Sequence, residues 1–321
     1  MNNRIIVALF SCIAAAFVCP AVYGQNGIDL KNWMGDMPGD RPISWLTIPG
    51  THDSGARYDT PLFSNTANAQ DLTIAEQLAI GVRFLDIRCR SFYDTFGVWH
   101  GPINQNLSFD EVINTCLDFL DAHPSETIIM SVKKEGDDVE GSTLDFQEIM
   151  ANYIAENPYY WYTKNAIPTL DEARWGIVLV RRFSQHAQLP GDVNPNPDGI
   201  DASGWKDPAP EPFRTDGALL QIEDFYNPPG GPKPAAYVAK EIEILNNIDD
   251  CANDPSNRMY ISFTSATGNV FRDPITSYSD VINPWLINET FVWGYGIYGI
   301  LAMDHVDENL AWWAVSTNYN L

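Results

Sequence analysis

The chain has 321 residues, and 45% of them are apolar, which suffices for a full hydrophobic core in one large domain or two small ones. Its formal net charge is −23, from 42 acidic and 19 basic side chains. This balance argues against a nucleic-acid-binding protein and against a polybasic membrane patch, and we attribute most of the charge to solubility.

The first 24 residues have the pattern of a secretory signal peptide. Met1–Arg4 carries one positive charge, Ile5–Val18 is an apolar run, and Val22–Gly24 ends in a small residue. We expect cleavage after Gly24, which leaves residues 25–321 as one secreted domain. The alternative is a membrane anchor, but the apolar run is shorter than the roughly 20 residues of a spanning helix.

The cysteines do not suggest a metal or redox motif. Cys12 and Cys19 leave with the signal peptide, and Cys89, Cys116 and Cys251 remain. Three thiols permit at most one disulfide, whose pairing stays open. The absence of a Cys-x-x-Cys pair argues against a zinc knuckle.

Short runs rich in β-branched residues recur along the chain and predict strands. They are mostly apolar rather than alternating, as in parallel strands that are buried on both faces. The predicted strands are Ile43–Ile48, Arg83–Arg88, Thr127–Val132, Ile177–Arg181, Ala218–Ile222, Met259–Phe263 and Ile297–Ala302.

Helical patterns lie between several of these strands. The clearest is Ser108–Leu120, where Ser108 is a cap, Glu111 follows three residues on, and the apolar side chains share one stripe. Asp71–Leu78 is a second helix, and residues 184–217 and 225–236 are predicted surface loops. Alternating strands and helices favour a single-domain α/β fold, a closed (β/α) barrel, over an open sheet, which periodicity alone does not exclude.

Charged side chains follow the predicted strands, which is where the active site of a barrel lies. Because buried charges are costly unless paired, their convergence on one face indicates a functional site. The clusters are His52-Asp53, Asp86 with Arg88, His100, Lys133 to Glu135, Arg181-Arg182, and Asp304-His305.

Two histidines and an arginine suit phosphoryl transfer. One imidazole takes a proton from a hydroxyl, the other gives a proton to the leaving oxygen, and the guanidinium neutralises the phosphoryl oxygens. Any single histidine is more often structural, and His123 and His186 are assigned that way.

Several long motifs are recognisable, and they cover most of the chain beyond the signal peptide. In family order they resemble the X domain of bacterial phosphatidylinositol-specific phospholipase C, which implies an irregular (β/α)8 TIM-type barrel. The motifs are Trp45–Gly55, Phe84–Arg88, Trp99–Pro102, Pro124–Glu135, Gly176–Ser184, Gln221–Tyr226, Ile261–Ser265 and Met303-Asp304.

The resemblance implies the catalytic residues. His52 corresponds to the general base, with Asp304 to orient it, and His100 to the general acid, assisted by Asp53. Arg88 corresponds to the group that holds the phosphoryl oxygens.

The resemblance also implies the substrate-binding residues. Lys133, Arg182 and Asp224 correspond to contacts with inositol hydroxyls, and Tyr226 to the aromatic platform under the ring. Glu135 is expected to position Lys133.

Arg88 also bears on the cofactor. Calcium-dependent relatives hold a metal near the phosphate, whereas a guanidinium cannot coordinate a cation, so we expect no metal and no cofactor. Asp86 receives no role beyond that of a candidate partner for a neighbouring cation. A mere pair of Arg88 with Asp86 is disfavoured, because the guanidinium must still reach the cleft.

The match to the family thins at 57–75 and at 186–217. The first segment corresponds to a rim helix that helps related enzymes sit on lipid. A second rim is expected at 266–272 with Val270 and Phe271 at its tip, although Phe271 fits a core-capping role equally well. Since the acidic surface repels anionic bilayers, insertion of this rim is expected to drive membrane adsorption.

The resemblance implies a secreted, monomeric phosphatidylinositol diacylglycerol-lyase that gives diacylglycerol and inositol 1,2-cyclic phosphate. Its partner is phosphatidylinositol in membranes, and glycosyl-phosphatidylinositol anchors are a further possible substrate. Two alternatives stay open: a related phosphodiesterase that acts on another glycerophosphodiester, and an inactive domain that only binds inositol lipids.

Overall fold

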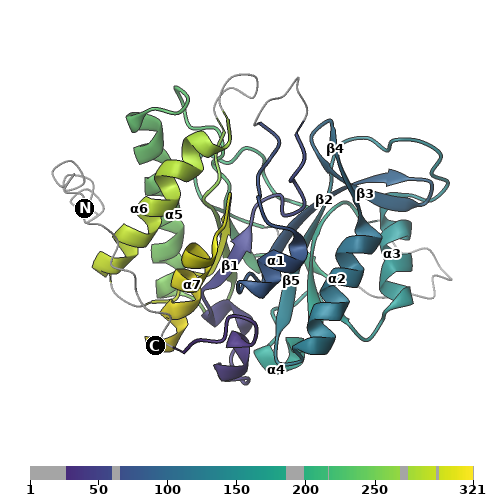
Figure 1. Ribbon diagram of the computed structural model, residues 1–321, viewed down its shortest axis with the longest axis horizontal. Helices are drawn as coiled ribbons and strands as arrows, with labels where there is room; N and C mark the ends of the chain where they lie inside the picture. The colour runs from purple at the N-terminus through teal and green to yellow at the C-terminus, as the bar shows by residue number, and fades with distance from the viewer. Residues whose placement is uncertain are drawn as a thin grey trace.

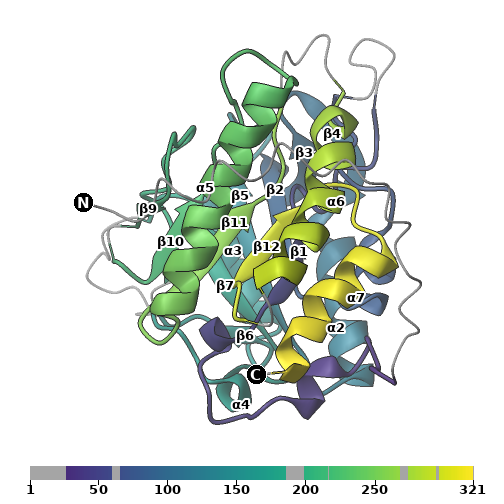
Figure 2. The same cartoon turned by 90° about the vertical axis from the view of Figure 1, so that its left-hand side faces the viewer.

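The computed structural model describes residues 27–59, 66–185, 199–215, 217–267, 274–293 and 296–320. The predicted signal peptide, His186 and the predicted rim residues Val270 and Phe271 lie outside these ranges. The described chain places strands at the centre and helices around them, with α5, α6 and α7 on one side and α2 and α3 on the other (Figure 1). Figure 2 shows α5, α6 and α7 in front of the strands.

The strands alternate with helices, as the sequence predicts. The strands are β1 (Ile48–Thr51), β2 (Phe84–Phe92), β3 (Thr95–His100), β4 (Ile103–Ser108), β5 (Thr127–Lys134), β6 (Trp161–Tyr162), β7 (Gly176–Arg182), β8 (Ile200–Asp201), β9 (Phe213–Arg214), β10 (Leu220–Glu223), β11 (Met259–Phe263) and β12 (Ile300–Met303). The α-helices are α1 (Ile74–Ala79), α2 (Phe109–Ala122), α3 (Phe146–Glu156), α4 (Leu170–Ala173), α5 (Pro234–Asn253), α6 (Thr276–Trp293) and α7 (Glu308–Ser316), and the 3₁₀ helices are η3 (Trp33–Asp36), η4 (Ile43–Trp45) and η5 (Thr317–Asn320).

One sheet contains all of these strands, and its main row has the order β6-β7-β5-β2-β1-β12-β11-β10-β9. Off this row, β3 pairs with β2 and β4, and β8 pairs with β7. The pairs from β7 through β10 are parallel, so their carboxyl ends share one edge. At the two ends of the row, β8 pairs with β7 and β9 runs antiparallel to β10. In the described ranges no ladder joins β8 to β9, so the barrel is irregular and open on that side.

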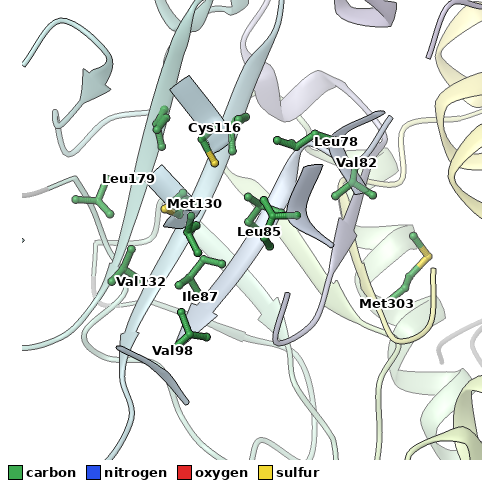
Figure 3. Packing of buried hydrophobic residues seen from close by; sticks show 14 of the residues in the cluster. Leu78, Val82, Leu85, Ile87, Val98, Cys116, Met130, Val132, Leu179 and Met303 are labelled. Atoms are coloured by element: carbon green, nitrogen blue, oxygen red, sulfur yellow. The ribbon is translucent and has the colours of Figure 1, made fainter. Parts of the chain in front are cut away.

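The alternation of side chains along β2 separates the two faces of the sheet. Leu85 and Ile87 belong to the core between sheet and helices, where Met130 and Cys116 also pack (Figure 3). Phe84 belongs to a second core on the opposite face of the sheet, inside the barrel, with Ile48, Val178 and Ile261 among its members. A period of two therefore turns the residues at positions 86 and 88 toward the barrel interior.

The helices begin where their capping residues stand. Ser108 accepts from the Glu111 backbone N–H and Glu111 bonds back to Ser108, so α2 starts at the residue after the cap. The predicted helix is thus confirmed and runs two residues further. The second predicted helix starts later than Asp71, because Thr73 forms the same capping box with Glu76.

The first predicted strand is wrong over most of its length. Ile43–Trp45 forms η4, and the strand starts at Ile48. The Ile43 N–H donates to the Pro168 carbonyl and Trp45 N–H returns to the Pro42 carbonyl, so this apolar run closes a turn instead of joining a ladder.

The hairpin of β3 and β4 was not predicted. Its strands contain glycine and several polar residues, and its β2–β3 turn depends on left-handed backbone at Tyr93 (φ 46°) and Asp94 (φ 59°). The predicted loop at 184–217 contains two strands of two residues each, β8 and β9. The predicted loop at 225–236 ends three residues early, because Pro234 begins α5.

Cys89, Cys116 and Cys251 are all buried and free, so the three are not joined by a disulfide.

No helix in the described part of the chain is long and apolar enough to cross a bilayer.

Candidate active site

The first pair of the site stands at the carboxyl ends of β1 and β12. Thr51 lies opposite Met303 in their ladder, and the His52 N–H donates to the Met303 carbonyl (2.9 Å), so His52 and Asp304 leave the sheet together. Nδ1 of His52 lies 2.7 Å from Oδ1 of Asp304, whose side chain is buried. A carboxylate at Nδ1 holds the proton on that nitrogen and leaves Nε2 as the acceptor.

The pKa of His52 lies above its ordinary value. Burial of the imidazole lowers this pKa, but the negative charge of Asp304 and its hydrogen bond raise it, with help from Asp53. Arg88 opposes them. The ring is therefore a basic group, and its carboxylate partner favours the cation that forms when a proton arrives.

The second imidazole comes from the hairpin. His100 ends β3, and its ring centroid lies 6.4 Å from that of His52, at 86° to it. Nδ1 of His100 lies 3.0 Å from the Ala67 carbonyl oxygen and 3.7 Å from Oδ2 of Asp53. At this separation one phosphate can touch both rings.

Arg88 reaches the same place from β2. Its Nη1 lies 3.4 Å from Oδ2 of Asp53, and its Nη2 and Nε each lie 3.1 Å from Oδ2 of Asp86. Arg88 therefore pairs with Asp86, the candidate partner, but not with Asp86 alone, because both side chains point into the barrel and one guanidinium serves two carboxylates. Burial lowers the pKa of Arg88, but the two carboxylates outweigh burial and raise it, so the group stays a cation.

Asp86 holds several of these groups together. Its Oδ1 accepts from Nη1 of Arg182 (3.1 Å) and from the Ser131 hydroxyl (3.3 Å), and its Oδ2 accepts from the Asp53 backbone N–H (3.2 Å). Burial raises the pKa of Asp86, but Arg88 and Arg182 lower it well below its usual range. The sequence left this residue without a role, and it lies fully buried among the cations.

A row of cations crosses three neighbouring strands. Arg88 of β2 lies opposite Lys133 of β5, which lies opposite Arg182 of β7. Nζ of Lys133 is 2.9 Å from Oε2 of Glu135 and 3.8 Å from Oδ2 of Asp207. Burial raises the pKa of Glu135, but Arg88 and Lys133 lower it below its usual value. The row gives one wall of the site a positive lining.

Aromatic groups line the wall beyond this row. The Trp205 ring lies 3.6 Å from Cζ of Arg182, and its Nε1 donates to Oδ2 of Asp224 (2.8 Å). Burial and a hydrogen bond to Asp207 raise the pKa of Tyr226 to about 12, so its hydroxyl stays protonated. Arg182, Asp224 and Tyr226, which are predicted to contact a sugar ring, thus lie together with Trp205 and Asp207.

Sequence reasoning missed Trp205 and Asp207. Both belong to the segment between β8 and β9, whose proline, glycine and aspartate content looks like surface loop. The one available signal was a tryptophan in an otherwise polar stretch. His123 lies apart, with Nδ1 2.8 Å from the Asn32 side-chain oxygen, in keeping with its structural assignment.

No cluster of three or more His, Cys, Asp or Glu side chains in the described ranges is arranged to hold a metal ion. The carboxylates of Asp53 and Asp86 are both engaged by Arg88. Independence from a metal stays a prediction.

Comparisons with known proteins agree with the motifs. The family described as "Phosphatidylinositol-specific phospholipase C, X domain" matches residues 46–183. The chain is similar to a Staphylococcus aureus protein named 1-phosphatidylinositol phosphodiesterase, with 32% identity over 288 residues, 86% of this chain and 88% of the relative. A Listeria monocytogenes protein of the same name is 28% identical over 290 residues, 87% of this chain and 82% of that protein.

Solved structures give the same result for the fold. A mutant phosphatidylinositol-specific phospholipase C from Staphylococcus aureus superposes with a TM-score of 0.76 at 28% identity, over 90% of this chain and 97% of that one. The enzyme from Listeria monocytogenes superposes with a TM-score of 0.71 at 26% identity, over 90% and 99% of the two chains. These matches confirm the predicted resemblance and the predicted barrel.

Proposed function

Because the chain belongs to the family of bacterial phosphatidylinositol-specific phospholipases C, we propose that it cleaves phosphatidylinositol to diacylglycerol and inositol 1,2-cyclic phosphate. One observation carries the mechanism: two imidazoles have centroids 6.4 Å apart, each lies beside a buried carboxylate, and the Arg88 guanidinium contacts one of these carboxylates. One phosphodiester can contact all three groups.

His52 is the general base. The Asp304 carboxylate holds the Nδ1 proton, so Nε2 accepts the proton of the inositol 2-hydroxyl. The freed oxygen attacks phosphorus and forms the new phosphorus–oxygen bond. The buried carboxylate then stabilises the imidazolium that results.

His100 is the general acid and enters the reaction protonated. Its Nδ1–H donates to the Ala67 carbonyl, with Asp53 3.7 Å away, so Nε2–H faces the leaving group. That proton goes to the glycerol oxygen as its bond to phosphorus breaks. The two histidines exchange protonation states in one turnover, and a later proton exchange resets them.

Arg88 stabilises the charge that develops on the non-bridging phosphoryl oxygens. Its carboxylate partners fix the planar group before substrate arrives, so the guanidinium can stabilise the transition state without first reorganising. A guanidinium in this position supports turnover without a metal ion, since its charge takes the place of a cation's.

Specificity for inositol is assigned to the wall of cations and aromatics. Lys133 and Arg182 donate to ring hydroxyls, Asp224 accepts from them, and Tyr226 lies against the ring face. Glu135 keeps the Lys133 ammonium in place at 2.9 Å. A non-sugar alcohol would offer these groups fewer hydroxyls to bind, which disfavours the alternative glycerophosphodiesters.

The place of action is part of the proposal. The N-terminal pattern supports secretion after cleavage at Gly24, and a relative of known structure is described in terms of its membrane binding. We assign transient adsorption to the rim with Val270 and Phe271, and we expect a monomer, while glycosyl-phosphatidylinositol anchors stay an open candidate substrate.

Phosphorus NMR of the mature protein with phosphatidylinositol vesicles tests the function. Appearance of a five-membered cyclic phosphate signal supports it, and a different phosphorus product indicates another glycerophosphodiesterase. No product together with cosedimentation of the protein and the vesicles indicates an inactive lipid-binding domain. His52→Ala is the matched control, because it removes the base and leaves the rest of the pocket.

A further inference from the structure

Residues Thr66–Gln70 form a short segment that crosses the carboxyl ends of the strands bearing both histidines. The Ala67 carbonyl faces Nδ1 of His100, and the Ala69 carbonyl accepts the His305 N–H (2.8 Å). The segment is fastened to the far side of the His52 turn, because the Ala69 and Gln70 N–H groups both donate to the Ala56 carbonyl.

The Gln70 side chain makes the closest link to the proposed base. Its Nε2 lies 2.8 Å from the His52 carbonyl oxygen and 2.8 Å from the Met303 carbonyl oxygen, and it donates one hydrogen to each. Its Oε1 accepts the Val306 N–H at 3.4 Å. The residue is 1% exposed, so water does not replace these bonds.

These bonds stand where the β1–β12 ladder stops. The last ladder partners are Thr51 and Met303, and the chain turns away into left-handed backbone at Asp53 (φ 43°) and His305 (φ 49°). Beyond the last ladder pair, the His52 N–H still donates to the Met303 carbonyl (2.9 Å), but the His52 carbonyl accepts from the Gln70 side chain instead of a neighbouring strand. The Gln70 carboxamide bridges the two strands at that level.

We propose that Gln70 is a positioning residue that sets the His52–Asp304 geometry by bridging the carbonyls of His52 and Met303. The inference rests on the proposed function for its kinetic effect, but not for its structural one. A buried donor pair that spans two strand ends restrains their spacing directly, because its loss would take one buried hydrogen bond from each of the two carbonyls. Gln70 touches no reacting atom in this account.

Gln70→Met tests the proposal, with Gln105→Met as the matched control. Methionine keeps the length and the burial and removes both donors. Gln105 is also buried, and it accepts the Tyr58 N–H (2.7 Å) with no contact to either histidine. Displacement of a base by about 1 Å can cost about 100-fold. We expect kcat of Gln70→Met to fall about 10–100-fold with KM nearly unchanged, and kcat of Gln105→Met to stay within about twofold of wild type.

A second readout needs no turnover. The His52 Nδ1–H bonded to Asp304 should give a far-downfield proton NMR resonance, assigned by its loss in His52→Ala. Gln70→Met should shift or broaden it, and Gln105→Met should leave it in place. If the wild type does not cleave phosphatidylinositol, the proposed function fails, and this resonance still decides the role of Gln70.

Three results would overturn the proposal: wild-type kcat in Gln70→Met, an equal loss of kcat in Gln105→Met, or an unmoved resonance in Gln70→Met. If Gln70→Met does not fold, Gln70→Glu replaces it, since the carboxyl group keeps the shape and the acceptor for Val306 but cannot make both donations. The same kinetic and spectroscopic criteria apply to that variant.

Discussion

Replacing Asp304 by Asn removes the charge beside the proposed base and keeps its shape. The Nδ1–Oδ1 distance of 2.7 Å puts the imidazolium and carboxylate charges about 4 Å apart, where an effective dielectric constant of about 20 gives an attraction of about 4 kcal/mol. Since about 1.4 kcal/mol is a factor of ten, the full loss is about 1,000-fold. The amide keeps a weaker hydrogen bond, so we expect kcat to fall about 100–1,000-fold.

Asp304→Asn should also shift the pH dependence of the reaction in a definite direction. The Asp304 charge raises the pKa of His52, so its removal lowers that pKa. The base must be neutral to accept a proton, and activity is lost as the pH falls through its pKa. The acid limb of the kcat/KM profile should therefore move to lower pH in Asp304→Asn.

Initial rates on phosphatidylinositol in mixed micelles across pH measure both effects. Asp71→Asn is the control, because it removes a carboxylate 3.0 Å from Nδ1 of another histidine, His305, outside the proposed mechanism. It should leave rate and profile unchanged. An Asp304→Asn enzyme within tenfold of wild type, or an acid limb that does not move, would refute the assignment of Asp304 to the base.

His100→Ala should lower the rate on phosphatidylinositol about 10²–10⁴-fold but recover part of it on an inositol phosphate nitrophenyl ester, because nitrophenolate needs little protonation when it leaves. His52→Ala should show no such recovery, and rates of both variants on the two substrates test this. Recovery of His52→Ala alone would reverse the two roles. Activity should persist in excess EDTA and Arg88→Asp should be nearly inactive there; loss on chelation that calcium restores would contradict the metal-free mechanism. Lys240→Met should lower the free energy of unfolding, measured in urea, by about 3–5 kcal/mol, because Glu223, which pairs with Lys240 at 2.7 Å, becomes a buried unpaired carboxylate. The double variant Lys240→Met/Glu223→Leu should recover much of this free energy. A single variant as stable as wild type would contradict the prediction.

The parts of the site that the sequence predicts are those at the ends of regular strands. His52, Arg88, Lys133 and Asp304 each follow an apolar run, and parallel pairing brings such ends to one edge whatever the intervening loops do. The strand boundaries near them are therefore less important than their order. The first strand begins at Ile48 instead of the predicted Ile43, but His52 still follows its carboxyl end as predicted.

The remaining parts depend on contacts that no local pattern records. Trp205 and Asp207 enter the site because their segment folds back over β7 and β10, and its composition is that of a loop. Gln70 is defined by partners far away in sequence and resembles an ordinary polar residue. Asp86 stands close to Arg88 in the sequence, but its bonds to Arg182 and to the Asp53 N–H are not visible there. The hairpin strands β3 and β4 contain few apolar residues, so the alternation of apolar and polar residues along them is too weak to predict a strand.

The hairpin that supplies His100 ties the proposed acid to a different part of the fold from the proposed base. The base stands on the central parallel ladder of the barrel, but the acid stands on β3, which pairs antiparallel with β2 and whose far end is held by Asp94 accepting from the Thr143 (2.6 Å) and Leu144 (2.9 Å) N–H groups. Phe96 and Val98 of β3 are buried in the core between sheet and helices. The position of the acid therefore depends on how this hairpin packs on the core, whereas the position of the base depends on the barrel ladder.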